Sequence, residues 1–470
     1  MKPVIKRPSS DDEAPVDILN VGCSNRSLVL LYLYHVNSGM AAVPDEALAL
    51  SPHRWTIDEL KSAYEEALES PVDVNKHLPP KQNRRYVIVG GSGLVGNWIV
   101  THLLTRGEHP TAVRVLDLQP PRRELLDQGV SFVKTNVTDE KGVSSAFARK
   151  WEPEVADLPL TVFHCAAVIR PAERHRAFLD FCRNVNVGGT VNVLNAAKQF
   201  GASCMVATSS GSVCIRRPSF WIAPWTKVPK YLAQVLSDAS PVPKEHDHFF
   251  GNYAVTKAEA EHIICAADDL KSNFRTGCIR PTNGIYGIGE DNSATVTGQY
   301  LRSGGNVSWT YDIIHNFVNA ENVSIAHLNY EKCLIDQTKT PDQLPNIGGQ
   351  AFVVTDPNPA VTFGDIYLLL SKFSKTPVNF PRVPAIPFVL LSYVIEWYAL
   401  FQHMYCPWLP RLTGDLAQLQ PALFFVTNVH TLCDDSRARK SPEQGGLGYA
   451  PPITTLGGMC KQLVEWNKNV

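Results

Sequence analysis

The sequence has no excess of charge of either sign and no cysteine pattern typical of a metal site. Its 470 residues include 44 Lys and Arg and 45 Asp and Glu, so the formal net charge is −1 and does not favour nucleic acid as a partner. The 11 cysteines are an odd number, and no Cys-x-x-Cys pair or zinc-like spacing occurs. We therefore expect no metal ion, and buried free thiols in a reducing compartment rather than disulfides.

Two kinds of long apolar segment are also absent. Residues 1–20 are polar and acidic, and the first apolar run, residues 28–34, comes too late and is too short for a secretory signal. No run reaches the roughly 18 uninterrupted apolar residues of a membrane-spanning helix. Residues 383–404 come closest, but they contain two prolines and Glu396. We expect a protein that is not secreted and that lies on the cytoplasmic side.

From residue 85 onward, short apolar runs alternate with amphipathic segments. This alternation predicts an α/β fold with a Rossmann-type doubly wound parallel sheet. One helix is expected over residues 97–106 and another over residues 178–200. The predicted strands are residues 86–89, 112–116, 130–133, 161–165, 202–208 and 277–280.

Residues 1–80 precede this alternation and form an N-terminal extension. Residues 1–15 have the composition of a disordered segment. Thr56 and Glu59 are spaced as a capping box that opens a helix with apolar residues along one face. We expect this helix to pack against the main domain, and we assign the extension no chemistry.

A glycine-rich turn directly follows the first predicted strand. Gly90, Gly93 and Gly96 form a G-x-x-G-x-x-G pattern, with Leu94 and Val95 at the start of the next helix. Such glycines let the backbone turn tightly and approach a pyrophosphate, while the helix N-terminus offers free N–H groups and partial positive charge. Because the pattern lies between a strand and a helix, it predicts a dinucleotide site.

Asp117 ends the second predicted strand. A carboxylate there accepts hydrogen bonds from both hydroxyls of the adenosine ribose and repels a 2′-phosphate, so we predict NAD rather than NADP. Arg122 and Arg123 follow on the same loop and weaken that preference, although ordinary solvated loop charge explains them as well. Asn136, after the third strand, is a candidate adenine contact.

Three residues further along the chain predict acid–base chemistry on an alcohol. Tyr253 and Lys257 are one helical turn apart and share a helix face. A free tyrosine, with a pKa of about 10, is a poor base at neutral pH. The Lys257 ammonium and a positive nicotinamide ring are expected to lower this pKa. Ser210 ends the fifth predicted strand and would hydrogen-bond the same alcohol oxygen, so we predict Tyr253 as the general base and Ser210 as the positioning group.

Asn186 lies in the helix that precedes the serine strand. A buried amide there could order a water chain to Lys257. It could equally make a satisfied structural hydrogen bond, and the sequence leaves both interpretations open.

Together these motifs resemble the extended short-chain dehydrogenase/reductases, and within them the family of 3β-hydroxysteroid dehydrogenase/isomerases and sterol-4α-carboxylate 3-dehydrogenases. By this resemblance, Ser210, Tyr253 and Lys257 form the catalytic triad, and the last two also contact the cofactor. Ala166 and Pro281 would line the nicotinamide end of the site. The matching segments, spread over residues 86–466, are residues 89–96, 115–118, 163–167, 186–190, 208–210, 253–261, 280–281, 285–287, 317–323, 348–352 and 447–449.

The resemblance implies NAD-dependent oxidation of a secondary, 3β-type hydroxyl on a steroid or terpenoid ring to the ketone, with a lipophilic small molecule as substrate. Where a carboxylate lies beta to the new ketone, decarboxylation can follow. The alternative is an NADPH-dependent ketone or aldehyde reductase of secondary metabolism, against which Asp117 argues. A third hypothesis, a non-catalytic redox-sensing or scaffold protein, conflicts with the presence of both Tyr253 and Lys257.

On this basis the chain divides into the extension of residues 1–80, an NAD-binding Rossmann domain of residues 81–285 and a smaller C-terminal substrate-binding region of residues 286–470. Residues 219–250, rich in aromatic side chains and proline, interrupt the Rossmann domain as a loop or flap. This insertion and the extension depart from the family pattern and leave the precise substrate open.

Members of the family often hold membranes through an apolar C-terminal part. Residues 383–404 could lie in a membrane interface, with Tyr393, Trp397 and Tyr398 at headgroup level, or could form an ordinary core helix. Both interpretations fit the sequence. Peripheral association with the endoplasmic reticulum membrane and a homodimer are further hypotheses.

Overall fold

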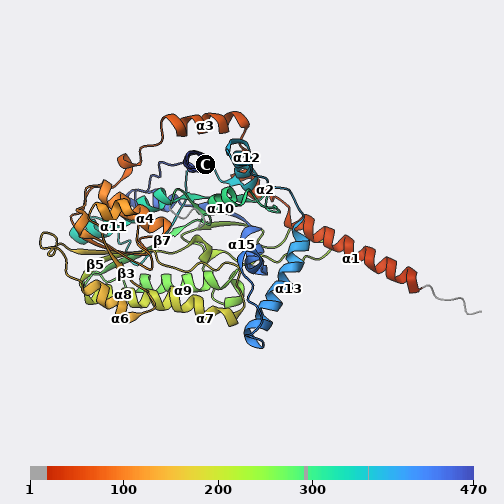
Figure 1. The fold of residues 1–470 in the computed structure, drawn as a ribbon, viewed down its shortest axis with the longest axis horizontal. Coiled ribbons are helices and arrows are strands. Elements are labelled where there is room, and N and C mark those ends of the chain that lie inside the picture. The colour runs from red at the N-terminus through yellow and green to blue at the C-terminus, as the bar shows by residue number, and fades with distance from the viewer. Residues whose placement is uncertain (1–17, 290–294, 358) are drawn as a thin grey trace, which may run out of the picture.

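A central parallel sheet organises the molecule. The computed structural model describes residues 18–289, 295–357 and 359–470 (Figure 1). The sheet has seven strands in the order β11-β7-β5-β4-β1-β2-β3, and all neighbours run parallel. The winding therefore reverses between β1 and β4, and the predicted doubly wound sheet is confirmed. The strands are β1 (Arg85–Val89), β2 (Val113–Asp117), β3 (Ser131–Lys134), β4 (Leu160–His164), β5 (Ala202–Thr208), β7 (Arg275–Pro281) and β11 (Ala351–Val354).

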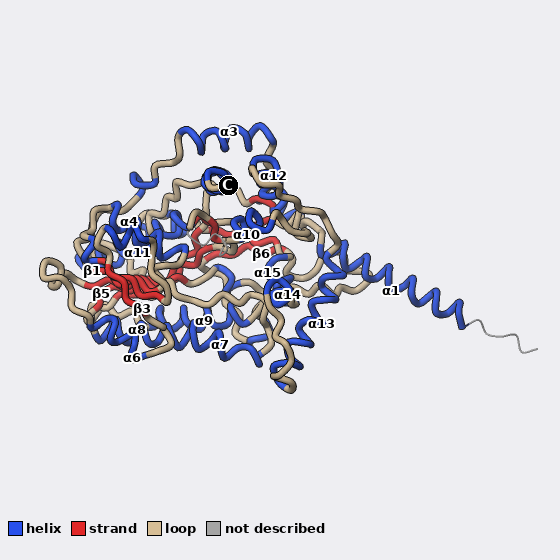
Figure 2. Tube along the Cα trace, in the orientation of Figure 1, coloured by secondary structure: helices blue, strands red, loops and turns tan. Residues whose placement is uncertain are grey.

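Helices cover both faces of this sheet (Figures 1 and 2). Strand β1 explains why: Tyr86 and Ile88 pack into one apolar cluster, while Val87 and Val89 pack into the other. Fully burying such a side chain contributes about 1.5–3 kcal/mol, so a strand buried on both faces has to be apolar throughout. On one face lie α4 (Leu94–Thr105) and α11 (Ala320–Lys339); on the other lie α6 (Glu140–Ala148), α7 (Leu179–Arg183), α8 (Gly189–Gln199) and α9 (Asn252–Ala266).

In its described part, residues 18–80, the N-terminal extension contains the α-helices α1 (Ile18–Met40), α2 (Asp45–Leu50) and α3 (Ile57–Glu69). Helix α3 begins at the predicted capping box of Thr56 and Glu59 and packs against α17 (Thr455–Lys468), as expected. Helix α1 projects from the body of the molecule, and its C-terminal end lies against α13 (Ala385–Met404) (Figure 1). The expected disorder of residues 1–15 lies outside the described residues.

A second, smaller sheet accompanies the C-terminal region and has the strand order β12-β9-β13-β6. Its strand β6 (Ala233–Ser237) belongs to the insertion of residues 219–250 and pairs in parallel with β13 (His430–Asp434). The expectation that the whole insertion is a loop is therefore wrong, because backbone hydrogen bonds to a strand distant in sequence hold part of it. Strands β9 (Ile314–His315) and β12 (Val361–Thr362) complete this sheet, and β8 (Ile285–Tyr286) and β10 (Val318–Asn319) form a separate two-stranded sheet.

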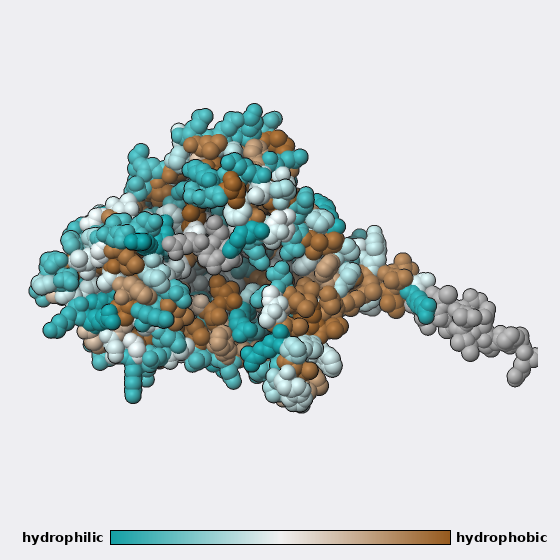
Figure 3. All heavy atoms as spheres, viewed as in Figure 1, coloured by the Kyte–Doolittle hydropathy of each residue, from teal (hydrophilic) through white to brown (hydrophobic). Residues whose placement is uncertain are grey.

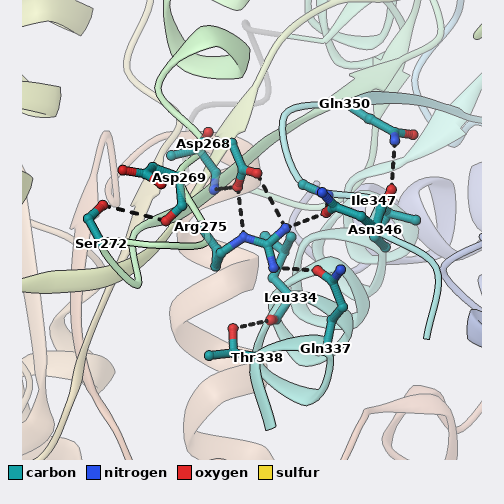
Figure 4. Close-up of polar contacts among 12 residues, drawn as sticks. Asp268, Asp269, Ser272, Arg275, Leu334, Gln337, Thr338, Asn346, Ile347 and Gln350 are labelled. Atoms are coloured by element: carbon teal, nitrogen blue, oxygen red, sulfur yellow. Dashed lines mark hydrogen bonds and ion pairs between the residues drawn. The ribbon is translucent and has the colours of Figure 1, made fainter. Parts of the chain in front are cut away.

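A buried cation fixes strand β7 to its surroundings. The Arg275 side chain is only 1% exposed, and its Nε donates to Asp268 Oδ1 at 3.0 Å (Figure 4). It also donates to Asn346 Oδ1 at 2.6 Å and to Gln337 of α11. An unpaired buried charge would cost several kcal/mol, so this network stabilises the position of β7.

The remaining helices are α5 (Arg123–Asp127), α10 (Val296–Ser303), α12 (Phe363–Phe373), α14 (Gly414–Gln418), α15 (Pro421–Thr427) and α16 (Ser436–Arg439).

Candidate active site

The glycine-rich turn joins β1 to α4 at the point where the sheet reverses its winding. Gly90 has a φ of +82°, and a Cβ there would lie 2.5 Å from the backbone nitrogen of Ala166. A Cβ on Gly96 would overlap the carbonyl oxygen of Gly90. A Cβ on Gly93, in contrast, would meet only the Gly90 oxygen, at 3.4 Å. Close packing therefore explains two of the glycines, and the third borders open space.

The start of α4 has the character of an anion site. Gly93 is its N-cap residue and provides no side-chain hydrogen bond. The N–H groups of the first turn, at Leu94 and Val95, consequently have no partner within the helix and carry its partial positive charge. These features and the space at Gly93 fit a pyrophosphate, so the turn could hold a dinucleotide.

Asp117 lies at the edge of this turn. Its carboxylate accepts hydrogen bonds from the backbone nitrogens of Ser92, at 3.1 Å, and Leu118, at 2.7 Å. Arg122 is directed to α4, where its Nε donates to Asn97 Oδ1 at 3.1 Å. The Arg123 side chain is 90% exposed and lies 3.8 Å from Asp127. Neither guanidinium is hydrogen-bonded to Asp117, which agrees with ordinary roles for both arginines.

The remaining predicted cofactor residues surround the same edge of the sheet. Ala166 follows β4, donates from its backbone nitrogen to Val89 O at 3.0 Å and contacts Gly90. Pro281 is buried at the end of β7. Asn136 is exposed, and its Oδ1 accepts hydrogen bonds from Thr138 within its own turn, at 3.0 and 3.1 Å. Its contact with adenine stays a prediction.

The structure brings Ser210 and Tyr253 together at the carboxyl end of β5. Ser210 caps a short turn and lies 2.7 Å from Ser212, measured between the hydroxyl oxygens. Tyr253 is in the first turn of α9. Burial raises the pKa of Tyr253 to about 12, and its hydrogen bond with Ser210 acts in the opposite direction. The sequence predicted a lowered pKa; in the structure, the loss of solvation outweighs the stabilising contacts.

Lys257 follows one turn along α9. Its Nζ donates to the carbonyl oxygen of Thr208, at the end of β5, at 2.5 Å. Burial lowers the pKa of Lys257, and nearby groups that include Cys278, Cys165 and Glu261 raise it. The ammonium is thus anchored to the serine strand. It is not among the groups that shift the pKa of Tyr253 here, so the expected acidification of the phenol stays a prediction.

A buried ion pair behind the catalytic residues was missed from the sequence. Glu261, on the same face of α9 as Lys257, accepts a hydrogen bond from Ser209 Oγ at 2.6 Å. It also accepts two from Arg280 of β7, at 2.8 and 2.5 Å, and both charged side chains are 8% exposed. The pair joins α9 to the ends of β5 and β7. The spacing of Lys257 and Glu261, four residues on one helix face, was the available signal.

Asn186 makes structural hydrogen bonds. It lies in a π-helical turn, residues 184–188, that separates α7 from α8. Its Oδ1 accepts from Val168 N at 2.8 Å, and its Nδ2 donates to Thr256 Oγ1 of α9 at 3.0 Å. The structural interpretation is thereby confirmed, and a water chain to Lys257 stays a prediction. The long helix expected over residues 178–200 is interrupted here, as π turns often are at functional sites.

Within the described ranges, no group of three or more His, Cys, Asp or Glu residues could hold a metal ion. The cysteines whose side chains are described are all free: Cys165, Cys182, Cys204, Cys214, Cys265, Cys278, Cys333, Cys406, Cys433 and Cys460.

Comparison with known proteins agrees with this geometry. A sequence profile of the 3-beta hydroxysteroid dehydrogenase/isomerase family matches residues 87–379, more than half of the chain. Over 391 residues, the chain is 26% identical to 3beta-hydroxysteroid-dehydrogenase/decarboxylase isoform 2 of Arabidopsis thaliana, a match that covers 80% of this chain and 61% of that protein. It is also 26% identical, over 397 residues, to the decarboxylating sterol-4-alpha-carboxylate 3-dehydrogenase of Saccharomyces cerevisiae, covering 80% and 96%. The chain thus spans less than two thirds of the Arabidopsis protein.

Solved structures with the same fold include two UDP-glucose 4-epimerases. The enzyme of Thermus thermophilus, solved in complex with NAD, has a TM-score of 0.50 at 19% identity, with 82% of this chain and 100% of that chain covered. The enzyme of Thermotoga maritima, solved with UDP-glucose, has a TM-score of 0.52 at 17% identity, with 82% and 99% covered. At these identities the likeness shows the fold alone. The profile match and the site geometry agree, and the chain belongs to the 3-beta hydroxysteroid dehydrogenase/isomerase family.

Proposed function

We propose that this protein oxidises a 3β-type hydroxyl on a sterol or related terpenoid ring to the ketone with NAD⁺, and that a carboxylate beta to this ketone is then lost as CO₂. The observation that carries the proposal is the position of α9 beside the carboxyl end of β5. Lys257 of α9 donates to Thr208 O at the end of that strand, Ser210 follows two residues later, and Tyr253 lies one turn before Lys257 and interacts with Ser210. The glycine turn after β1 lies at the same edge of the parallel sheet. Ligands of doubly wound folds bind at this edge, next to the reversal of winding.

The roles of the side chains follow from the chemistry. The Tyr253 phenolate accepts the proton of the substrate hydroxyl, and the Ser210 hydroxyl hydrogen-bonds the same oxygen. The carbinol C–H bond breaks with its electron pair, and NAD⁺, when bound, supplies the hydride acceptor. Because burial raises the pKa of Tyr253, the phenolate needs nearby positive charge, which Lys257 and the oxidised nicotinamide would contribute. General-base catalysis of this kind is worth roughly 10²–10⁴ in rate.

Decarboxylation needs no further protein group in this proposal. The electron pair of the breaking C–C bond passes to the new ketone, which becomes an enolate, while the carboxylate leaves as CO₂. The enolate then takes up one proton from solvent and returns to the ketone. The names of the Arabidopsis and yeast relatives support this step, since both refer to decarboxylation.

NAD rather than NADP is favoured by the environment of Asp117. A carboxylate at the end of β2 would face the 2′ position of the ribose and repel a phosphate there. Arg122, a candidate phosphate partner on the loop after β2, is held by Asn97 and Thr101 on α4. The alternative of an NADPH-dependent reductase gains no support from these contacts.

Contact with the endoplasmic reticulum membrane, from the cytoplasmic side, is a further part of the proposal. Among the described residues, α13 is the one helix long and apolar enough to span a bilayer, although a partly buried core helix passes the same test. Its Val394 and Trp397 are 61% and 64% exposed, and on α1 Leu30 is 67% exposed. Figure 3 shows this apolar surface where α1 leaves the body.

Of the predicted headgroup residues, Tyr393 and Tyr398 are half-buried and only Trp397 is exposed. We propose that α1 and α13 lie in the interface and give a lipophilic substrate access. The homodimer stays a prediction.

The proposed function is tested by incubating the purified protein with 4α-carboxysterols and with 3β-hydroxysterols that lack the carboxylate, following NADH absorbance and CO₂ release. We expect NADH from both classes and CO₂ only from the first. Formation of NADPH but not NADH, or no reduction of either cofactor with any sterol or terpenoid alcohol, would refute the proposal.

A further inference from the structure

A second candidate site lies outside the proposed active site. A cavity of about 760 Å³ opens between the insertion, α13 and α15. Its lining includes the cations Arg216, Arg217, Lys230 and Lys244. It also includes apolar and aromatic side chains, among them Trp221 of the insertion and Tyr393 of α13. None of the residues assigned above to catalysis or to the dinucleotide lines this cavity.

Arg217 is the cation that most clearly lacks a counter-charge. Its guanidinium lies 4.4 Å from the ring centroid of Phe425. No hydrogen bond or ion pair joins that guanidinium to another residue in the described parts of the chain. Arg174, which faces the adjoining cavity with Arg217, is bound at 2.8 and 2.7 Å by both carboxylate oxygens of Glu396. Burial and the neighbouring Arg174 lower the pKa of Arg217, and this outweighs the opposite effect of Tyr393, Glu396 and Asp247, none of which pairs with the guanidinium.

Tyr231 lies in the same cavity and contacts two of its cations, Arg216 and Lys230. Its φ of +62° lies in the left-handed region, which is strained for a bulky side chain and is typical of functional sites. Arg216 Nη1 donates to the Tyr231 hydroxyl at 3.3 Å, and Lys230 Nζ lies 4.9 Å from the ring centroid. Hydrogen bonds from both cations lower the pKa of Tyr231.

The two acidic residues of the cavity offset these cations only in part. Glu245 and Asp247 are 76% and 78% exposed, and each lies against a histidine: His248 at 3.8 Å and His246 at 3.1 Å. Four cations and two carboxylates leave two positive charges in the lining.

We propose that this cavity binds the phosphate group of an anionic amphiphile, with the apolar part of the ligand against Trp221 and Tyr393. A guanidinium without a partner favours bidentate binding of a phosphate, and a phosphate monoester, with a charge of about −1.5 to −2, balances the excess. The inference goes beyond the proposed dehydrogenase activity and does not depend on it. Two sources have this chemistry: a bilayer phospholipid next to α13, or a soluble phosphorylated amphiphile.

The test measures binding of dihexanoyl phosphatidic acid to the full-length protein by calorimetry, without any dinucleotide. We expect saturable binding, with an affinity that falls about tenfold or more in Arg217→Gln. The same fall is expected in Lys230→Gln, which changes a more exposed residue and is less prone to disturb the fold. Lys61→Gln, which removes the same charge on α3 away from the cavity, should leave it unchanged. Circular dichroism and NAD affinity verify that each variant is folded. Absence of binding by the folded wild type, or equal binding by all variants, overturns the proposal.

Vesicles then distinguish the two sources. Phosphatidylcholine vesicles are compared with and without a minor share of phosphatidic acid. Stronger binding to the anionic vesicles that depends on Arg217 identifies a bilayer lipid. Binding of the soluble phosphatidate without such a difference identifies a soluble amphiphile, and both results support the phosphate site. If wild-type protein binds the phosphatidate but forms no NADH from any sterol, the dehydrogenase proposal fails and the phosphate site stands.

Discussion

Glu261 and Arg280 form a buried, two-bond ion pair that joins the catalytic helix α9 to β7. Because Ser209 also donates to Glu261, the pair holds the residue next to Ser210. Its position makes it a structural support for the catalytic geometry, with no contact to the reacting atoms required.

The first prediction concerns this pair. Glu261→Gln leaves the Arg280 cation buried without an anion, and breaking such a pair costs roughly 3–5 kcal/mol of unfolding free energy. We expect kcat to fall with KM nearly unchanged, because the position of Ser210 is disturbed and the substrate surface is not. Chemical denaturation and steady-state kinetics measure the two effects. Glu259→Gln, on the same helix α9, is the matched control. It breaks a two-bond pair with Arg183 of α7, but Glu259 and Arg183 are 36% and 47% exposed. An exposed pair is worth about 0–1 kcal/mol. Equal destabilisation by both substitutions would contradict the assignment.

The second prediction separates the glycines of the turn by their surroundings. Gly96→Ala would force a methyl group into the Gly90 carbonyl oxygen, so we expect strong destabilisation. Gly93 has a φ of −73° and free space, so Gly93→Ala should fold normally and yet bind NAD more weakly, because the methyl group occupies the proposed pyrophosphate position. Thermal unfolding and NAD titration test this. A Gly93→Ala variant with unchanged NAD affinity would remove the pyrophosphate from this turn.

The third prediction concerns cofactor choice. Hydrogen bonds to a charged group contribute about 1.5–3 kcal/mol, so Asp117→Ala should weaken NAD binding by roughly tenfold to a hundredfold. NADP should lose much less, since its 2′-phosphate is no longer repelled. Arg122→Gln should change neither affinity appreciably, because Arg122 is engaged on α4. Equilibrium binding of both dinucleotides to the three proteins provides the measurement, and a wild type that prefers NADP would contradict the role of Asp117.

The fourth prediction concerns the dependence of stability on pH. Burial raises the pKa of Asp356 to about 7, although hydrogen bonds from Asn319, Asn322, Tyr286 and Thr455 act against the shift. The folded protein therefore binds this proton more tightly than the unfolded chain, whose Asp titrates near 3.9. The stabilisation that this proton gives the folded state is fully present below the unfolded pKa and is lost as the pH rises through the folded pKa. The contribution of Asp356 to the free energy of unfolding therefore decreases from about pH 4 to pH 7.

Denaturation of wild type and Asp356→Asn across this range tests the sign. The variant should be less stable overall, because an amide nitrogen cannot accept the bonds that the carboxylate accepts, and it should lack this slope. A slope unchanged by the substitution would show that Asp356 does not titrate there.

Local patterns in the sequence account for most of the central sheet and for the glycine turn. Each of the six predicted strands overlaps an observed one, because a strand buried on both faces is apolar over its whole length. Strand β11 was missed, since Ala351–Val354 is short and lies beyond the regular alternation. Strand β6 was missed because its pairing partner, β13, is almost two hundred residues away.

The chemical environment of the site was less accessible to sequence reasoning. Spacing alone placed Tyr253 and Ser210 in one predicted site, since each follows from a motif, and the two side chains interact in the structure. Their catalytic roles stay predictions. The rise in the pKa of Tyr253 on burial was not predicted, because it depends on how much of the folded chain covers the phenol. The lowering expected from Lys257 and a bound nicotinamide ring stays a prediction. The Arg280 partner of Glu261 and the cation-lined cavity depend on contacts between distant segments, which no local spacing reveals.

The most direct test of the central claim compares wild type with Tyr253→Phe in a single turnover of bound sterol and NAD⁺. The account predicts that NADH formation slows by roughly 10²–10⁴, while the affinity for NAD is nearly unchanged. An unaltered rate of NADH formation in the folded variant would contradict it.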